Sequence, residues 1–282
     1  MNNKLLPTVT ILSTMLLTST AALADLTMGV FPRRPVAKTH KFFKPLAEKL
    51  SQEMGEPVKL VVAKNFKEFW KGAKNGTYDL VHYNQYHYLL SHKEKGYKVI
   101  AVNEEFGSNS IAGSLSVRKD SDINSVNDLK GKTILFGGGK KAMGSYIAPT
   151  AALQNAGLVA GKDYTVKFSK NPPSAVIGVY NKAADAAGAG NVILKVKGVT
   201  KKIDSSQMKI LVESEKFIHL AWAVKGDMPQ AKADKIQSIM TSLKSSAPAV
   251  LKAAKVTNFV KAADSDFTKV REIVKSVTGE AL

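Results

Sequence analysis

Apolar and polar residues along the chain follow two alternating patterns. Short apolar runs are separated by longer stretches in which apolar residues recur every third or fourth position, the spacing of an amphipathic helix. Gly55 and Gly76 stand where two of these helical stretches end, and Asn65 stands where one begins. The pattern predicts strands at 26–31, 58–63 and 79–83, with helices at 39–54 and 66–75 between them. This order predicts a parallel sheet covered by helices.

A second set of elements in the same order begins near residue 116. Its predicted strands are 133–136, 164–168 and 185–188, with helices at about 145–156 and 173–181. Two further strands follow, at 208–212 and 219–224. After them come a helix that starts at Pro229, at 229–243, and a last helix at 267–277. Because the terminal helices have no sheet of their own, we expect them to pack on the first unit.

The two units predict an α/β protein of two lobes, each with its own sheet. Two strands would cross between the lobes, near 114–118 and 220–224, and form a hinge over a cleft. Ligands of such sheets lie at the carboxyl ends of strands and at helix N-termini, and closure about a hinge traps them. The predicted division is a signal peptide at 1–24, lobe 1 at 25–115 plus 222–282, and an inserted lobe 2 at 116–221.

The first residues have the order of a cleavable secretory signal. Lys4 precedes an apolar stretch over 5–17, and small residues follow up to Ala24. The stretch is too short to cross a hydrocarbon core of about 30 Å as a helix, although an N-terminal membrane anchor is the alternative. We therefore expect export to the periplasm and a mature chain that starts at Asp25.

Charge and cysteine content limit the partners. The formal net charge of +18 suits an anionic ligand, a nucleic acid or an anionic membrane surface, or is a solvated basic surface. No Arg-rich or basic-aromatic nucleic-acid motif occurs, so we expect no nucleic-acid partner. The chain has no Cys, which excludes thiolate metal sites, thiol catalysis and a lipid anchor on Cys.

The segment 136–146, Phe-Gly-Gly-Gly-Lys-Lys-Ala-Met-Gly-Ser-Tyr, is the most distinctive candidate for ligand binding. It lies between a predicted strand and a predicted helix, where glycines let the backbone approach a ligand and free N–H groups suit an anion. It is not a P-loop, because Lys and Ala follow Lys140 where that motif needs Ser or Thr. An ordinary Gly-rich connection is the alternative. The candidate ligand contacts are Lys140, Lys141, Met143, Gly144, Ser145 and Tyr146.

Polar and aromatic residues also follow other predicted strands. We interpret 84–88 as a turn in which Tyr83, Asn84 and Tyr86 either present polar groups to the cleft or pack between helix and sheet. Arg33 follows the first strand and either pairs with an anion through two N–H groups or faces solvent. Asn171 follows the strand at 164–168 and is either a ligand contact or a helix cap.

No catalytic or metal-binding motif emerges. His82, His87 and His92 recur every five residues, which on a helix turns successive side chains by about 140° and keeps them off a common face. Ser145 does not lie in a Gly-x-Ser-x-Gly elbow, and no His-Glu-x-x-His or obvious carboxylate pair occurs. We expect a binding protein without metal or other cofactor; an enzyme whose catalytic pair forms only in space is the alternative.

Five short segments together resemble a known family. They are Pro-Leu-Ala-x-x-Leu at 45–50, Gly-Thr-Tyr-Asp-Leu at 76–80, Ser-Val-Asn-Asp-Leu-Lys-Gly-Lys at 125–132, Tyr-Ile-Ala-Pro at 146–149 and Ala-Ala-Asp-Ala-Ala-Gly-Ala at 183–189. From about residue 26 to at least 225, the chain resembles the phosphate/phosphite/phosphonate-binding proteins of ABC importers. The resemblance implies the two-lobed fold of periplasmic binding proteins, a small-molecule ligand and a membrane permease as partner. We also expect the protein to be a monomer.

The ligand motifs differ from those of the family. Phosphonate-binding members usually carry Ser-Thr-Ser-Gly where this chain has Ala-Met-Gly-Ser at 142–145, and Ser-His-Asp where it has Asn-Pro-Pro at 171–173. Fewer hydroxyls offer an anion fewer charge-assisted hydrogen bonds. The expected ligand is an oxyanion or phosphonate-like compound held by Lys140 or Lys141, or else a more apolar organic or lipid molecule. A sensor accessory of a membrane receptor kinase is a second alternative for the same fold.

Overall fold

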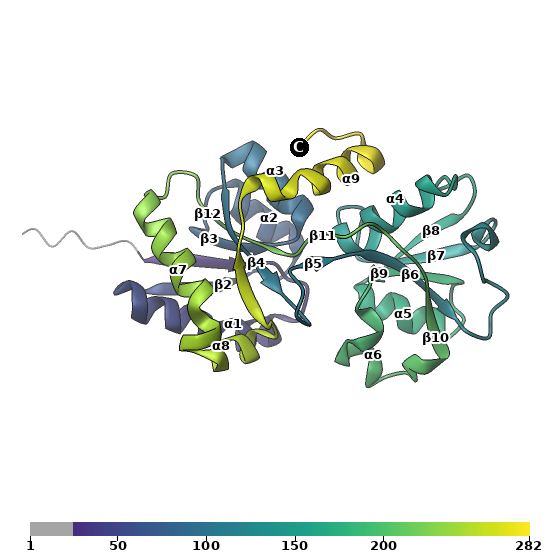
Figure 1. The fold of residues 1–282 in the computed structure, drawn as a ribbon, viewed down its shortest axis with the longest axis horizontal. Helices are drawn as coiled ribbons and strands as arrows, with labels where there is room; N and C mark the ends of the chain where they lie inside the picture. Colours follow the sequence, from purple (N-terminus) through teal and green to yellow (C-terminus); the bar gives the residue numbers. More distant parts are fainter. Residues whose placement is uncertain (1–24) are drawn as a thin grey trace, which may run out of the picture.

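A computed structural model describes residues 25–282, which form two lobes joined by a narrow neck (Figure 1). The predicted signal peptide lies outside the described residues. Within 25–282, every helix is too short or too polar to pass through a bilayer.

The sheet of the first lobe has six strands in the order β13-β4-β12-β3-β1-β2. Its first three strands in sequence are parallel, whereas β12 runs antiparallel to β3 and β4, and β13 runs antiparallel to β4. The carboxyl ends of β1, β2 and β3 therefore lie at the edge where β4 ends and β12 begins. The strands are β1 (Leu26–Val30), β2 (Val58–Val62), β3 (Leu80–Tyr83), β4 (Lys98–Glu104), β12 (Ala221–Val224) and β13 (Asn258–Lys261).

Helices cover both faces of this sheet. On one face lie α1 (Val36–Met54), α7 (Gln230–Ser246) and α8 (Pro248–Ala254), and on the other α2 (Phe66–Lys74) and α3 (Gln85–Lys95). Helix α1 buries the apolar side chains whose spacing predicted it, and Gly55 ends it in the left-handed conformation with a φ of 75°. The Oδ1 atom of Asn65 accepts a hydrogen bond from the Glu68 N–H at 2.9 Å, which confirms the predicted cap of α2.

The sheet of the second lobe has five strands in the order β10-β6-β9-β7-β8. β7, β8 and β9 are parallel, and β6 and β10 complete the sheet in antiparallel pairs. The strands are β6 (Gly113–Arg118), β7 (Thr133–Gly137), β8 (Thr165–Ser169), β9 (Ala186–Gly190) and β10 (Met208–Glu213). Helix α4 (Ala148–Asn155) covers one face, and α5 (Pro172–Tyr180) with α6 (Lys197–Thr200) covers the other.

The similarity between the two lobes extends to individual hydrogen bonds. In the first lobe the Thr27 N–H donates to Asp79 Oδ2 at 2.8 Å, and in the second the Thr133 N–H donates to Asp185 Oδ2 at 2.8 Å. Each aspartate N–H donates in turn to the carbonyl oxygen of the same threonine, at 2.9 and 3.0 Å. Both aspartates therefore join the start of one parallel strand to the segment that leads into another.

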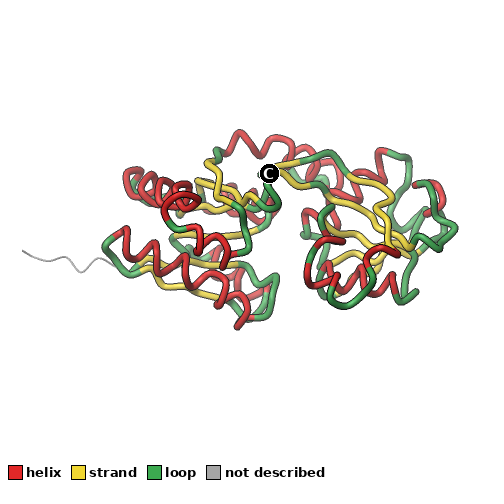
Figure 2. The backbone as a smooth tube through the Cα atoms, turned by 60° about the horizontal axis from the view of Figure 1, so that its bottom comes forward, coloured by secondary structure: helices red, strands yellow, loops and turns green. Residues whose placement is uncertain are grey.

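Two chain segments cross between the lobes and pair as β5 (Ser110–Ile111) and β11 (Phe217–Ile218). They run antiparallel at the neck, which Figure 2 shows from a second direction. The predicted two-lobed α/β fold with a hinge of two crossing strands is confirmed. The crossing strands are β5 and β11, whereas the segments predicted to cross, near 114–118 and 220–224, lie in the sheets of lobe 2 and lobe 1 as β6 and β12 (Ala221–Val224). Because β6 starts opposite the end of β9, the carboxyl ends of the parallel strands in lobe 2 also lie at the hinge.

Three features differ from the expectations. The predicted turn after β3 is wrong, because helix α3 begins at Gln85. All residues from 85 to 91 are buried, so the sequence lacks the alternation of a polar and an apolar face that marks an amphipathic helix. Strand β13 was not predicted. The last helix, α9 (Thr268–Thr278), contacts not only α3 of the first lobe but also α4 of the second (Figure 1).

Candidate functional site

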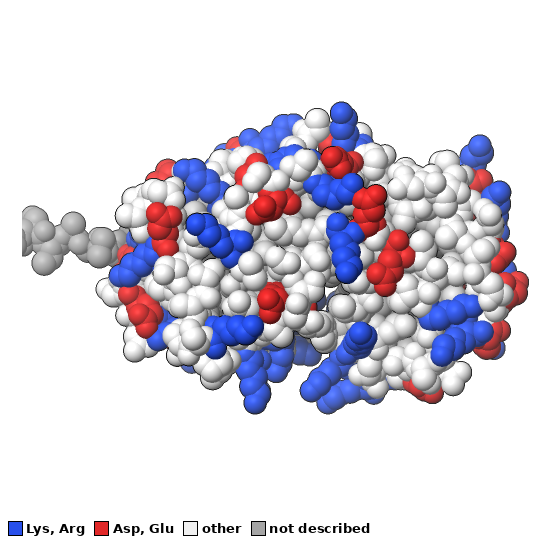
Figure 3. Space-filling view, viewed as in Figure 1, with Lys and Arg blue, Asp and Glu red and all other residues white. Residues whose placement is uncertain are grey.

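The edges of the two sheets that carry the carboxyl ends of the parallel strands face each other across the hinge. The loops that follow β1, β2 and β3 form one wall, and those that follow β7, β8 and β9 form the other. In Figure 3 a notch separates the two halves of the molecule, and Lys and Arg side chains lie on both of its sides. This cleft is the candidate functional site, since parallel sheets bind ligands at these strand ends.

Asn84 connects the two walls. Its Nδ2 donates to the carbonyl oxygen of Lys141 at 3.1 Å, and its Oδ1 accepts from the His87 N–H at 2.9 Å, which caps α3. His87 Nδ1 lies 2.7 Å from the same Oδ1. Because that oxygen can only accept, the proton of neutral His87 is on Nδ1. The Nζ of Lys141 also lies 5.7 Å from the centre of the Tyr86 ring. Lys141 of lobe 2 therefore contacts both Asn84 and Tyr86 of lobe 1.

The two candidate tyrosines of lobe 1, Tyr83 and Tyr86, are buried. Tyr83 is fully buried among the aromatic rings of lobe 1, and its hydroxyl donates to Ser91 Oγ at 3.1 Å. It packs between helix and sheet, which was the alternative for this residue. Tyr86 is 1% exposed, and its hydroxyl donates to Glu280 Oε2 at 2.6 Å. Its side chain therefore ties the C-terminal segment to α3.

The segment 136–146, the Gly-Lys segment, contains both exposed and buried residues. Lys140 and Lys141 are exposed, and Gly144 is half-buried, with open space where a side chain would stand. Met143 is 1% exposed and belongs to an apolar cluster that includes residues of both lobes. The Ser145 hydroxyl donates to the Gly137 carbonyl, so it is not available to a ligand.

The backbone forms a π-helical turn at Met143–Ile147, which determines where the side chains of this segment point. The N–H groups of Tyr146 and Ile147 both donate to the Ala142 carbonyl, at 2.8 and 3.1 Å. Such turns re-aim side chains and are frequent at functional sites. The Tyr146 ring packs against the rings of Phe136 and Phe168, with its centre 5.0 and 5.3 Å from theirs.

Asn171 caps helix α5. Its Oδ1 accepts from the Ser174 N–H at 3.0 Å and from the Ser174 hydroxyl at 2.9 Å. Its own loop touches the Gly-Lys segment, because a Cβ at Gly137 would lie 2.2 Å from Pro172 Cα. The helix cap was the alternative reading of this residue, and the loop of Asn171 still borders the cleft.

Arg33 lies in a group of polar residues at the hinge that the sequence did not reveal. Its Nη2 lies 3.2 Å from Glu105 Oε1, and the two side chains are 29% and 16% exposed. Glu105 follows β4 in one crossing segment, and His219 lies between β11 and β12 in the other. Asn103 Nδ2 donates to the same carboxylate oxygen at 3.2 Å. The pairing joins residues far apart in the chain, so no local pattern indicates it.

Burial keeps three histidines of this lobe neutral. It lowers the pKa of His219 to about 4 and that of His87 to about 3, the second with help from the positive charge of Lys141. The pKa of His82 is also lowered by burial and by the nearby Arg33. His82 Nδ1 faces the Ala221 carbonyl at 3.0 Å, and its ring stacks on Trp222. These imidazoles therefore act as neutral hydrogen-bonding groups at ordinary pH.

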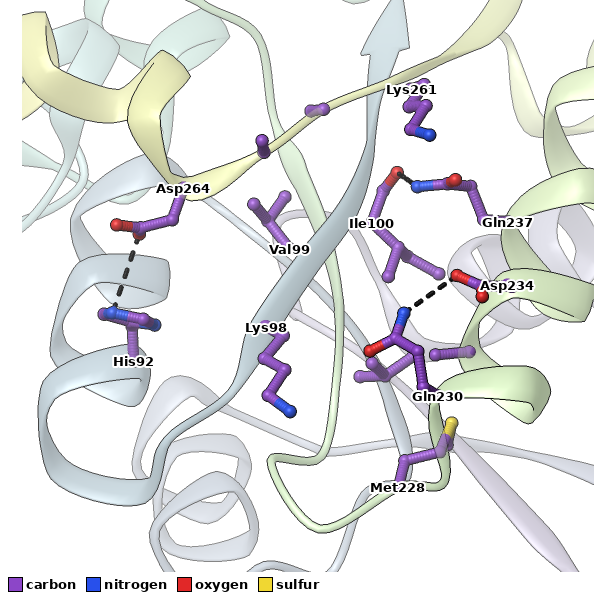
Figure 4. A pocket seen from close by; sticks show the side chains of 14 residues that line it. His92, Lys98, Val99, Ile100, Met228, Gln230, Asp234, Gln237, Lys261 and Asp264 are labelled. Atoms are coloured by element: carbon purple, nitrogen blue, oxygen red, sulfur yellow. Dashed lines mark hydrogen bonds and ion pairs between the residues drawn. The ribbon is translucent and has the colours of Figure 1, made fainter.

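A cavity of about 300 Å³ lies on lobe 1 at the opposite end of β4 from the hinge (Figure 4). Four of its polar side chains pair with one another: Gln230 Nε2 donates to Asp234 at 2.8 Å, and His92 lies 3.7 Å from Asp264. A second cavity of about 370 Å³ lies beside Tyr86, Lys141 and Glu280, at the rim of the cleft. Within 25–282, no three His, Asp or Glu side chains are grouped closely enough to hold a metal ion.

Solved structures of other binding proteins share this fold. XAC2383 from Xanthomonas citri, bound to ATP, is 16% identical, with a TM-score of 0.77 over 91% of this chain and 98% of its own. PhnD1 from Prochlorococcus marinus, in complex with methylphosphonate, is 17% identical, with a TM-score of 0.76 over 91% of this chain and 99% of its own. At these identities the likeness concerns the fold.

Sequence relatives point to two kinds of protein. The tetrathionate sensor histidine kinase TtrS of Salmonella typhimurium is 26% identical over 198 residues, which are 68% of this chain and 32% of the kinase. This chain thus spans about a third of the length of that curated relative. The family described as "ABC transporter, phosphonate, periplasmic substrate-binding protein" matches residues 28–267. The chain belongs to this family of periplasmic substrate-binding components of ABC phosphonate transporters.

Proposed function

We propose that this protein captures a small oxyanion in the cleft between its lobes and delivers it to the permease of an ABC importer. The observation that carries the proposal is the charge of the cleft walls. Arg33 and Arg34 lie on one wall and Lys140 and Lys141 on the other, and Glu105 is the carboxylate paired with this group. Such a surplus of positive charge attracts anions and makes a neutral lipid a poor ligand.

The ligand need not be a phosphonate. The hydroxyl that the Gly-Lys segment retains, Ser145, donates to Gly137, and the amide oxygen of Asn171 is used as a helix cap. We infer that arginine and lysine side chains replace the hydroxyl groups by which phosphonate-binding relatives hold their ligand. Arginine suits any oxyanion with two terminal oxygens, including phosphonates, phosphate and oxyanions of sulfur.

A calorimetric titration tests this function. The mature protein is titrated at constant ionic strength with methylphosphonate, phosphate, sulfate, thiosulfate and tetrathionate, with a soluble short-chain phosphatidylcholine for comparison. We expect micromolar or tighter binding of at least one oxyanion. Binding of the lipid alone would reject the proposal in favour of the apolar-ligand alternative.

Sensing is the second candidate function, because the similarity to TtrS covers 68% of this chain. In that role the closed, ligand-bound protein would contact a membrane receptor kinase. Deleting the gene distinguishes the two roles. Loss of uptake of the labelled oxyanion indicates transport, whereas intact uptake with loss of an oxyanion-dependent transcriptional response indicates sensing.

We further propose that the protein acts by binding alone, as a monomer. Ser145 donates to a backbone carbonyl rather than to a base, and His82, His87 and His219 are buried and neutral. The bound oxyanion should therefore be released unchanged. Mass spectrometry of the released ligand and light scattering of the protein, with and without ligand, test both statements.

A further inference from the structure

Arg33 and Arg34 form a cationic group at the point where lobe 1 meets the hinge. They occupy the loop between the carboxyl end of β1 and the start of α1. Arg33 pairs with Glu105, while the Arg34 guanidinium lies over the Phe42 ring, 5.3 Å from its centre. The amines of Lys38 and Lys255 approach the same ring, at 5.8 and 5.7 Å.

The positive charge of this group exceeds its negative charge. Among residues 25–282, no carboxylate or carbonyl oxygen pairs with the Arg34 guanidinium, although the side chain is partly buried. The charge of Arg33 and burial lower the pKa of Arg34 to about 9, and Glu105 opposes them only in part. The first turn of α1, which starts two residues later, contains no acidic residue. A partly buried guanidinium without a partner is unfavourable, so an anion there would stabilise it.

His219 adds a neutral donor to the group. The Leu220 N–H donates to His219 Nδ1 at 2.8 Å, so this nitrogen carries no proton and the neutral imidazole holds its proton on Nε2. Within the described chain, Nε2 has no hydrogen-bond partner, and the atom keeps some exposed surface. The charges of Glu105 and Arg33 both act on this imidazole. The Asn103 N–H donates to the Leu220 carbonyl at 3.0 Å, and the Asn103 side chain donates to Glu105 Oε1, so His219 lies next to the segment that carries Glu105. An Nε2–H donor is therefore available near the Arg33–Glu105 pair.

We propose that Arg33, Arg34 and His219 form the primary oxyanion subsite of the cleft, and that Glu105 is an internal counterion which the bound oxyanion replaces at Arg33. The inference rests on the proposed function. The main binding role then falls to Arg33, Arg34 and His219 at the hinge, and the Gly-Lys segment acts from the opposite wall of the cleft. The ligand class is an oxyanion with at least two terminal oxygens, matching the two N–H groups that a guanidinium presents side by side.

The counterion role has a specific consequence. Arg33 and Arg34 hold the oxyanion, so removing either charge weakens binding. Glu105 competes with the oxyanion for Arg33, so removing its charge strengthens binding. A Glu105 carboxylate that contacted the ligand directly as an acceptor would produce the opposite effect. The sign of the change at Glu105 therefore separates these two roles.

The test compares oxyanion affinity between variants, using the tightest-binding oxyanion of the panel above. R33Q and R34Q should each weaken binding about tenfold or more, E105Q should tighten it by about threefold or more, and H219A should weaken it by several-fold. R118Q is the charge-matched control, because Arg118 pairs with Asp120 and the Val179 carbonyl in lobe 2. Its affinity should equal that of the unchanged protein. Circular dichroism verifies folding, and R34K replaces R34Q if the latter is unfolded, since Lys keeps the charge but loses the paired N–H groups.

Failure of this inference differs from failure of the proposed function. If the unchanged protein binds no oxyanion, the proposed function fails. If it binds one and R33Q and R34Q bind it equally well, while the double variant K140Q/K141Q does not, the subsite lies on the Gly-Lys segment and the inference is wrong. Weaker binding by E105Q would reject the counterion role.

Discussion

The side-chain amide of Asn84 donates to the backbone carbonyl of Lys141 at 3.1 Å and so joins the two lobes directly across the cleft. The geometry of the amide is constrained from the other side by His87, whose Nδ1 lies 2.7 Å from Asn84 Oδ1. Because a carbonyl can only accept, the amide nitrogen must face Lys141 and its oxygen must face α3. A helix cap on one lobe therefore also holds the other lobe.

Replacing Asn84 by Ala should loosen the contact between the two lobes. The variant loses the hydrogen bond to Lys141 and the cap of α3, and leaves His87 Nδ1 without its partner. We expect the free energy of unfolding to fall by about 1–2 kcal/mol and the radius of gyration of the ligand-free protein to increase. Urea unfolding and small-angle scattering measure the two effects.

Asn65 provides the matched control for this variant. Its Oδ1 caps α2 in the same way, by accepting from the Glu68 N–H at 2.9 Å, and among the described residues its side chain makes no hydrogen bond to lobe 2. N65A should lose a similar stability of about 1 kcal/mol without a change in the radius of gyration. If N84A and N65A have the same dimensions as the unchanged protein, the Asn84–Lys141 bond does not control lobe closure.

Local patterns were sufficient for the overall fold. The apolar spacing of α1 and the caps at Asn65 and Gly55 are properties of neighbouring residues, so the two β-α-β-α-β units and the hinge were predictable. Helix α3 was not, because its start is buried on all sides and shows no polar face. Strand β13 owes its state to pairing with β4, which lies more than 150 residues earlier in the chain.

The polar group at the hinge shows the limit for functional residues. Arg33 and Glu105 are 72 positions apart, and His219 is still more distant. The position of Arg33 after a strand marked it as a candidate, but its partners depend on two crossing segments that only the folded chain brings together. Tyr83 illustrates the converse, since its position at a strand end looked like that of a ligand contact although its side chain points into the core.

Gly137 permits the close approach of the two loops on the lobe 2 wall. A Cβ at this position would lie 2.2 Å from Pro172 Cα and 2.4 Å from Pro172 N, and both are backbone atoms that cannot rotate away. G137A should therefore lower the free energy of unfolding by about 1–3 kcal/mol, as overpacking does. G139A is the control, because no atom lies within 4 Å of its Cβ position. Thermal unfolding compares them, and equal melting temperatures would show that the loops separate at little cost.

The buried histidines should make the protein sensitive to acid. The folded pKa values of His87 and His219, about 3 and about 4, lie below the unfolded value near 6.5. The unfolded chain therefore binds protons first as the pH falls, and stability decreases from about pH 6.5 toward the folded pKa. Each histidine should reduce the free energy of unfolding by up to about 1.4 kcal/mol per pH unit in that range.

Urea unfolding between pH 7 and pH 4.5 measures this dependence. H219Q should show a smaller loss of stability over that range than the unchanged protein, because Gln does not titrate. H40Q changes a histidine that is exposed on α1 and should leave the pH dependence as it was. An H219Q curve parallel to that of the unchanged protein would mean that other groups, such as the paired carboxylates, cause the acid sensitivity.

The apolar cluster that joins the lobes should make them unfold together. Met143 and Ile147 of lobe 2 pack in one cluster with Val270 and Val274 of α9, which also contacts α3 of lobe 1.

The equivalent aspartates of the two lobes allow each lobe to be weakened separately. D79A removes the acceptor for Thr27, and D185A removes the acceptor for Thr133; each change should cost about 1–3 kcal/mol. If the lobes form one cooperative unit, calorimetry shows a single transition that both variants move to lower temperature. Two transitions, of which D79A lowers one and D185A the other, would show that the α9 contact does not couple the lobes.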